Sequence, residues 1–78
     1  MIKANFKIMP SNPYIIFKAL SVETERDIPK TKVHLEYDEK NLMINIESEN
    51  ISSMRAAINS YMRWITLIED ILGLIENG

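Results

Sequence analysis

The sequence predicts an α+β fold, in which a three-stranded antiparallel sheet of order 1-3-2 carries two helices on one face. Two observations predict it. Three short segments alternate apolar and polar residues, as half-buried strands do, and two others carry apolar residues at helical spacing. The element order is β-α-β-β-α, and the connections are shortest when strand one lies beside strand three. With 78 residues and no internal repeat, the chain is expected to form a single domain over residues 1–78.

The first strand is expected over residues 2–8 and the first helix over residues 12–20. Ile2, Ala4, Phe6 and Ile8 alternate with polar residues, and Pro10 ends the strand. Ser11 or Asn12 can cap the helix through a side-chain oxygen. Pro13 then occupies the first helical position, where a proline loses no hydrogen bond. Apolar residues surround most of this helix, which indicates a second contact surface besides the sheet.

The polar segment 21–30 contains Pro29 and is expected to be a surface connection. Two further alternating runs, joined by the turn DEKN, predict a hairpin over residues 32–47. One face of the sheet should then be open to water. It is expected to carry Lys3, Asn5, Lys7, Lys32, His34, Glu36, Asn45 and Glu47.

A long helix is expected over residues 50–75, with Asn50 as its cap. Its apolar residues recur in steps of four and three, and a second apolar row runs beside the first. About 25 residues span roughly 37 Å as a helix, whereas each strand reaches only about 20 Å. The helix should therefore extend past the sheet and expose its end, ILGLI, which predicts an oligomer or a bound partner.

Composition argues against several classes of function. The chain has no cysteine and a net charge of -2, which disfavours disulfides, thiolate metal sites and a general attraction for nucleic acid. No segment resembles a signal peptide or a membrane span, so we expect a cytoplasmic protein that does not bind membranes. His34 is the one histidine, expected on the open sheet face. We therefore expect neither an enzyme nor a cofactor, metal or small-molecule substrate.

Residues 54–64 read MRAAINSYMRW and place a narrow polar stripe on an otherwise apolar helix. Arg55, Asn59 and Arg63 fall one turn apart, and neither arginine has an acid three or four positions away. One interpretation is that both arginines are solvated or pair with sheet acids such as Glu36 or Glu47. The other is a partner surface, where arginine and tryptophan often dominate binding.

This helix resembles that of the small dimerisation subunits of the KEOPS complex, which takes part in making threonylcarbamoyladenosine on tRNA. The resemblance is strongest over residues 50–72, where MRAAINSYMRW precedes ITLIEDIL, and it extends to FKAL at residues 17–20. It rests mainly on one set of residues: Arg55, Ala56, Asn59, Ser60, Arg63 and Trp64.

The resemblance implies a homodimer that packs its helices against the catalytic threonylcarbamoyl transferase subunit, as a non-catalytic scaffold. The residues expected to bind that subunit are Ile15, Ala19, Trp64, Ile68, Ile71 and Leu72. The candidates for contacting tRNA within the complex are Arg55, Asn59, Arg63, Lys3, Lys7 and Lys32.

Two alternatives remain open at this point. A small RNA-binding module could use the open sheet face, although that face is expected to lack the aromatic residues on which bases stack. A dimeric interaction domain that binds another helical partner would also account for the apolar helix faces that the sheet cannot cover.

Overall fold

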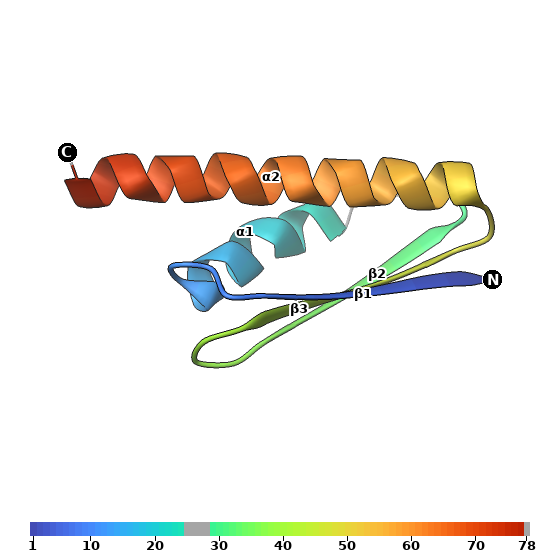
Figure 1. Cartoon of the computed structure of the whole chain (residues 1–78), viewed down its shortest axis with the longest axis horizontal. Helices are drawn as coiled ribbons and strands as arrows, with labels where there is room; N and C mark the ends of the chain where they lie inside the picture. Colours follow the sequence, from blue (N-terminus) through green and yellow to red (C-terminus); the bar gives the residue numbers. More distant parts are fainter. Residues whose placement is uncertain (25–28, 78) are drawn as a thin grey trace.

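The computed structural model describes residues 1–24 and 29–77 and confirms the predicted fold class. The elements are β1 (Ile2–Ile8), α1 (Pro13–Thr24), β2 (Thr31–Tyr37), β3 (Leu42–Ser48) and α2 (Ile51–Asn77). Figure 1 shows one sheet with both helices on the same side of it. In the described residues, no helix is long and apolar enough to cross a membrane.

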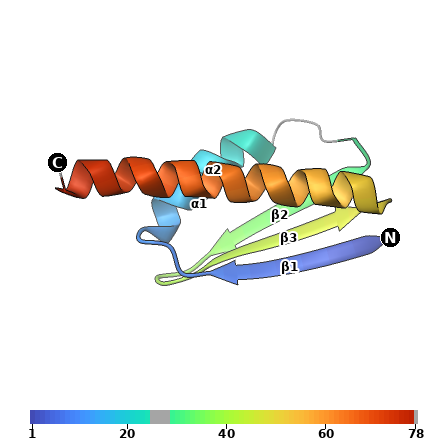
Figure 2. The ribbon, with the colours of Figure 1, turned by 45° about the horizontal axis from the view of Figure 1, so that its top comes forward.

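The sheet has the predicted order β1-β3-β2, and both pairings are antiparallel (Figure 2). Ala4 of β1 and Val33 of β2 both lie opposite Ile46 of β3. Because side chains alternate across a strand, the odd-numbered residues of β1 share the open face with the even-numbered residues of β2. Their burial follows this alternation, with Lys3, Asn5 and Lys7 all exposed.

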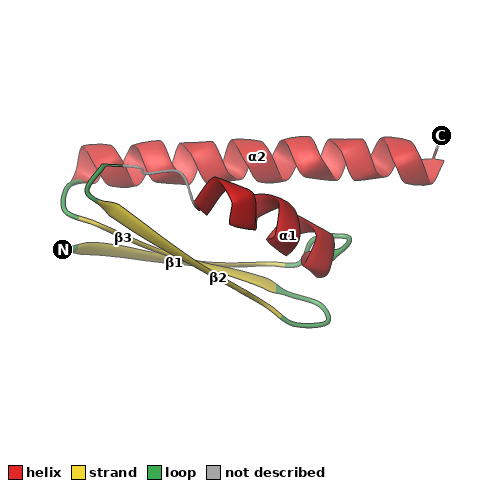
Figure 3. Ribbon diagram, turned by 180° about the vertical axis from the view of Figure 1, so that it is seen from behind, coloured by secondary structure: helices red, strands yellow, loops and turns green. Residues whose placement is uncertain are grey.

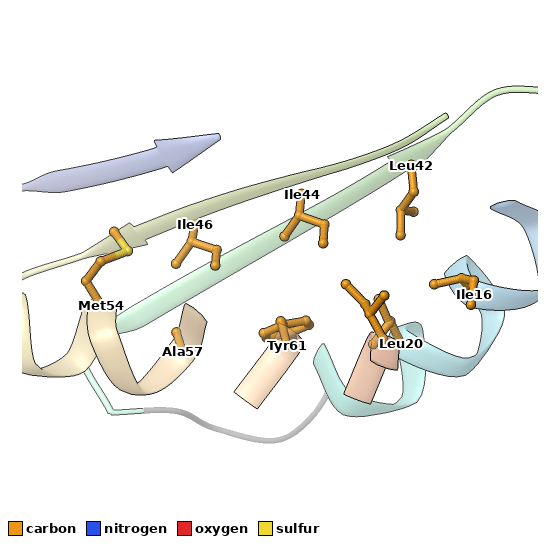
Figure 4. Packing of buried hydrophobic residues seen from close by; sticks show 9 residues of the cluster. Ile16, Leu20, Leu42, Ile44, Ile46, Met54, Ala57 and Tyr61 are labelled. Carbon is orange, nitrogen blue, oxygen red and sulfur yellow. The ribbon is translucent and has the colours of Figure 1, made fainter. Parts of the chain in front are cut away.

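The core lies between β3 and the two helices. Leu42, Ile44 and Ile46 are buried along β3, and Figure 4 shows their side chains directed toward α1 and α2. The buried hydrophobic cluster consists of Ile16, Leu20, Leu42, Ile44, Ile46, Met54, Ala57, Tyr61 and Ile65. The middle strand thus provides the floor of the core, as expected for a sheet covered on one face.

Both helices begin at predicted caps. The Asn12 side chain accepts a hydrogen bond from the Ile15 amide at 3.1 Å, and the Asn50 side chain accepts one from the Ser53 amide at 2.8 Å. Each satisfies an amide that the first turn of a helix leaves without a partner inside the helix.

The first helix is longer than the predicted range 12–20, because α1 continues to Thr24. Ser21 and Thr24 donate hydroxyl hydrogen bonds to backbone carbonyls within the helix, at 2.7 and 2.8 Å. Polar side chains that bond back to the helix in this way are compatible with another turn. Of the predicted connection 21–30, residues 25–28 lie outside the described part of the chain.

Helix α2 extends well beyond the sheet. It contains 27 residues against seven in each strand, and its C-terminal part projects past the β2–β3 turn (Figures 1 and 3). The molecule accordingly measures 42 × 20 × 18 Å. The predicted overhang is therefore a feature of the fold.

Candidate partner-binding surfaces

The polar stripe of α2 faces solvent. Arg55, Asn59 and Arg63 are all exposed, and neither guanidinium forms an ion pair with a carboxylate of the described residues. Glu36 and Glu47, the acids considered as partners, instead contact a histidine and a lysine of the sheet at 3.0 and 3.5 Å. The pairing interpretation is thus wrong for these two acids, and both arginines remain available to a partner.

The apolar face of α2 is buried in its first half and partly or fully exposed in its second half. Met54, Ala57, Tyr61 and Ile65 pack into the core, whereas no side chain from 66 to 75 is buried. The exposed apolar residues of this second half are Leu67, Ile71, Leu74 and Ile75. An apolar patch of this kind is typical of a surface that another protein covers.

The predicted partner-binding residues of α2 fall into two groups. Trp64, Ile68 and Leu72 are half-buried and pack against the core, whereas Ile71 is 47% exposed. The Trp64 ring lies edge-on to Tyr61, with centroids 5.1 Å apart, so the tryptophan packs against the buried tyrosine. Only part of this set is therefore free to make new contacts.

Helix α1 presents a second apolar row. Ile16 and Leu20 enter the core, while Ile15 is 39% exposed and Ala19 is half-buried. Val22 continues the row at helical spacing and is 60% exposed. Because α1 and α2 contact each other, this row lies on a helix adjacent to the one that carries the exposed patch.

Several exposed apolar side chains are absent from the predicted set. These are Val22, Leu67, Leu74 and Ile75. The steps from Ile15 to Val22 and from Leu67 to Leu74 could have identified them, because residues at these separations share a helix face. Leu74 and Ile75 belong to the end ILGLI, which the sequence predicted to be exposed without assigning these two residues to the partner surface.

An aromatic cluster at the β2 side was also missed. Tyr37 is close to both Tyr14 and Phe17, with ring centroids 5.7 and 4.6 Å away. The alternation Val33, Leu35, Tyr37 places the tyrosine on the covered face of the sheet, where α1 packs. The cluster joins the first turn of α1 to the end of β2 and leaves both tyrosines about half exposed.

Strand β1 carries an apolar face that the helices cover only in part. Ile2, Ala4, Phe6 and Ile8 are half-buried, although their neighbours on β3 in the same rows are almost fully buried. The helices pack mainly on β2 and β3, and β1 forms the other edge of the sheet. This edge therefore combines a partly exposed apolar face with unpaired backbone groups.

The open face of the sheet carries a mixture of charges rather than a basic strip. The register places Lys3 and Lys32 on either side of Glu47, and the Lys3 amine lies 3.5 Å from its carboxylate. Lys7 shares a row with Glu36 across the sheet. The predicted lysine and arginine contacts for tRNA lie on different elements, because the arginines are on α2.

Tyr61 is a titratable group that is buried in the core. Burial, followed by the nearby negative charge of Glu23, raises the pKa of the Tyr61 hydroxyl above its usual value. In the described residues, no group of three or more His, Cys, Asp or Glu side chains could hold a metal ion. His34 contacts Glu36 on the exposed face.

Comparison with known proteins identifies the family. A family model described as "Transcription factor Pcc1" matches residues 9–73, which is most of the chain. The chain belongs to the Pcc1 family. The matched range begins just after β1 and includes α1, the hairpin and α2 as far as residue 73. It also contains the whole MRAAINSYMRW segment on which the sequence resemblance rested, and that resemblance is confirmed.

A curated Pcc1 relative comes from Pyrococcus abyssi (strain GE5 / Orsay). That protein is called KEOPS complex subunit Pcc1, and this chain is 28% identical to it over 60 residues. The aligned part covers 77% of this chain and 68% of the relative.

Proposed function

We propose that this Pcc1 family member is a non-catalytic scaffold and dimerisation subunit of a KEOPS complex in the cytoplasm. It binds the catalytic threonylcarbamoyl transferase subunit through α1 and α2, and so supports threonylcarbamoyladenosine modification of tRNA. The observation that carries the proposal is the apolar surface of these two helices, in a chain similar to a named KEOPS subunit.

A non-catalytic role fits the chemistry of the described residues. Catalysis needs acids, bases or nucleophiles held together in a protected site. His34, the one histidine, lies on an exposed strand face against Glu36. Tyr61 projects from α2 into the hydrophobic core, where burial raises the pKa of its hydroxyl. Neither arrangement positions a reacting group against a substrate.

The helical surface is suited to packing against other helices. Ile15 and Ala19 lie on α1, which contacts α2. On α2, Trp64, Ile68 and Leu72 form a partly buried row, and Ile71 is more exposed. Apolar residues recurring at three and four positions are the contacts that helix-to-helix binding uses. We assign the catalytic subunit to this surface.

The test uses the exposed members of the set, so that the fold is preserved. The double variant Ile15→Asp/Ile71→Asp places two charges on the surface without emptying the core. Co-purification with the catalytic subunit should fall at least about tenfold, because each charge must be desolvated on binding. Ile51→Asp is the matched control, since Ile51 is 65% exposed at the opposite end of α2. Unchanged binding by the double variant would reject the assignment.

We assign the homodimer contact to the free edge of β1. A second β1 strand, related by a two-fold axis, would satisfy the unpaired backbone groups of both edges and cover both apolar faces. The opposite edge, β2, is less suitable because α1 already packs against that side of the sheet. Joining two β1 strands would produce a continuous six-stranded sheet.

Charge favours particular registers for this pairing. If Asn5 lay on the two-fold axis, Lys3 would face the partner's Lys7, and like charges directly opposite each other are unfavourable. With Ala4 or Phe6 on the axis, a lysine faces the partner's Asn5 instead. We therefore expect one of these two inner-face residues to meet its own copy across the interface.

Single cysteines can test both the edge and the register, because the natural chain has none. In the proposed dimer, Ala4→Cys or Phe6→Cys should form a disulfide with its own copy, since paired residues bring Cα atoms about 4.5–5.5 Å apart. Val33→Cys is the matched control, because Val33 and Ala4 lie opposite the same residue of β3. Cross-linking at Val33 alone would assign the dimer to β2.

Contact with tRNA is proposed for the complex as a whole. Arg55, Asn59 and Arg63 form one candidate surface on α2, and the lysines of the open sheet face form another. In Arg55→Gln/Arg63→Gln, tRNA affinity of the complex should fall and its salt dependence should become shallower if these arginines meet phosphates. The net charge of -2 gives no comparable reason for this chain alone to bind DNA or RNA.

A further inference from the structure

One polar contact joins the beginning of α1 to the second half of α2. The Ser11 amide donates to one carboxylate oxygen of Glu69 at 3.2 Å. The Ser11 hydroxyl lies 3.1 and 3.2 Å from the two carboxylate oxygens. These residues are 58 positions apart in the sequence. In the described part of the chain, their hydrogen bonds link α2 beyond Ile65 to the segment that leads into α1.

The position of Glu69 also suits the electrostatics of α1. The first turn of α1 contains no acidic residue of its own. Ser11 immediately precedes the capping residue Asn12, so the Glu69 carboxylate lies close to the N-terminal end of this helix. A negative charge is favourable there, because the amides of the first turn give that end a partial positive charge. Helix α2 thus supplies the acid that α1 lacks.

The contact lies at the junction of the two helices that form the proposed binding surface. Ile15 is in the first turn of α1, four residues after Ser11, and Ile68 and Leu72 flank Glu69 on α2. Beyond Ile65 no described side chain of α2 is buried, so few other contacts fix this half of the helix. The placement of α1 relative to this half of α2 therefore depends on contacts of partly exposed apolar side chains and on the hydrogen bonds between Glu69 and Ser11.

We propose that Ser11 and Glu69 are positioning residues, which hold the first turn of α1 and the second half of α2 in the arrangement that the partner binds. The effect on partner binding rests on the proposed function, whereas the contact between Ser11 and Glu69 does not. A surface held in its bound arrangement loses less conformational entropy on association, so the contact raises affinity without touching the partner.

Hydrogen exchange on the isolated chain tests the contact directly. In Glu69→Ala and in Ser11→Ala, amides in the first turn of α1 should exchange about fivefold faster, as expected for loss of a modest hydrogen bond. Asp70→Ala is the matched control, because Asp70 is the adjacent acid, is exposed, and forms no hydrogen bond or ion pair with α1 in the described part of the chain. Glu69→Gln keeps an acceptor oxygen and should retain most of the protection. Equal exchange in wild type and Glu69→Ala would overturn the proposal.

Binding to the catalytic threonylcarbamoyl transferase subunit tests the consequence. Affinity should fall about three- to tenfold in Glu69→Ala and by less in Ser11→Ala, which keeps the backbone amide bond to Glu69. The double variant should lose little more than Glu69→Ala, because Glu69→Ala already removes the whole contact. Full additivity would instead mean that Glu69 meets the partner directly, which contradicts a positioning role. A separate outcome is a wild-type chain that does not bind that subunit, with variants that still show faster exchange. That pair of results would refute the proposed function and the effect on binding, and it would leave the contact between Ser11 and Glu69 established.

Discussion

Replacing Tyr61 by phenylalanine should stabilise the protein. The side chain is fully buried, and its hydroxyl has no hydrogen-bond partner among the described residues. A buried donor left without a partner costs about 1–3 kcal/mol. Removing the oxygen leaves a small void, which costs roughly 0.4 kcal/mol. We therefore expect a net gain of about 1 kcal/mol, which corresponds to a rise in Tm of about 5 °C for a domain of this size.

Urea unfolding at pH 7 measures this difference. Tyr14→Phe is the matched control, because the Tyr14 side chain is 52% exposed and its hydroxyl can bond to water. That variant should stay within about 0.5 kcal/mol of wild type. A Tyr61→Phe protein less stable than wild type by about 1 kcal/mol would show that the hydroxyl is satisfied, and the reasoning would be wrong.

Alkaline pH provides an independent check on the same residue. Burial raises the pKa of Tyr61 in the folded protein above that of the unfolded chain. Above about pH 10 the unfolded state loses this proton while the folded state keeps it, so the wild type loses stability as pH rises. Phenylalanine does not ionise. The advantage of Tyr61→Phe should therefore increase between pH 8 and pH 11, and a constant difference would contradict the assigned burial effect.

Three further changes test other parts of the fold. Ile44→Ala, in the middle of the central strand, should destabilise the protein by about 2–5 kcal/mol in urea unfolding, because a fully buried side chain is truncated. Asp38→Asn should remove a contribution to folding stability that depends on pH. Backbone amides of the β2–β3 turn lower the pKa of Asp38. The ionised carboxylate therefore stabilises the fold above about pH 4, and this effect disappears as pH falls below that value. An acid titration followed by circular dichroism compares the two proteins. Arg55→Gln/Arg63→Gln should change stability by less than about 0.5 kcal/mol, since neither arginine pairs with a described carboxylate, and thermal unfolding checks this.

The fold was predictable because its signals are local. Alternation along β1 and β3 and the spacing from Met54 to Ile65 each specify one buried face within a few consecutive residues. Asn12 and Asn50 mark helix starts by chemistry that acts over three residues. Such features need no knowledge of the tertiary structure.

The candidate surfaces were only partly predictable, because exposure depends on what other elements cover. Spacing alone cannot show that Trp64 rests on Tyr61 while Ile71 projects into solvent. The contact between Ser11 and Glu69 joins positions 58 residues apart, and no local pattern marks it. The end of α1 was misplaced for a related reason, since polar residues read as a connection can also bond back to their own helix.

The two proposed interfaces follow from a mismatch between the layers of this small fold. Seven-residue strands reach about 23 Å, so they cannot cover a helix of 27 residues, and one end of α2 is left exposed. Two helices placed mainly over β2 and β3 also leave the apolar face of β1 only partly covered at the opposite edge. Because α1 lies on the β2 side, the helical surface and the β1 edge are separated across the sheet. A chain with this geometry can pair with its own copy through one surface while the other remains open to a different partner, which is what a dimerising scaffold requires.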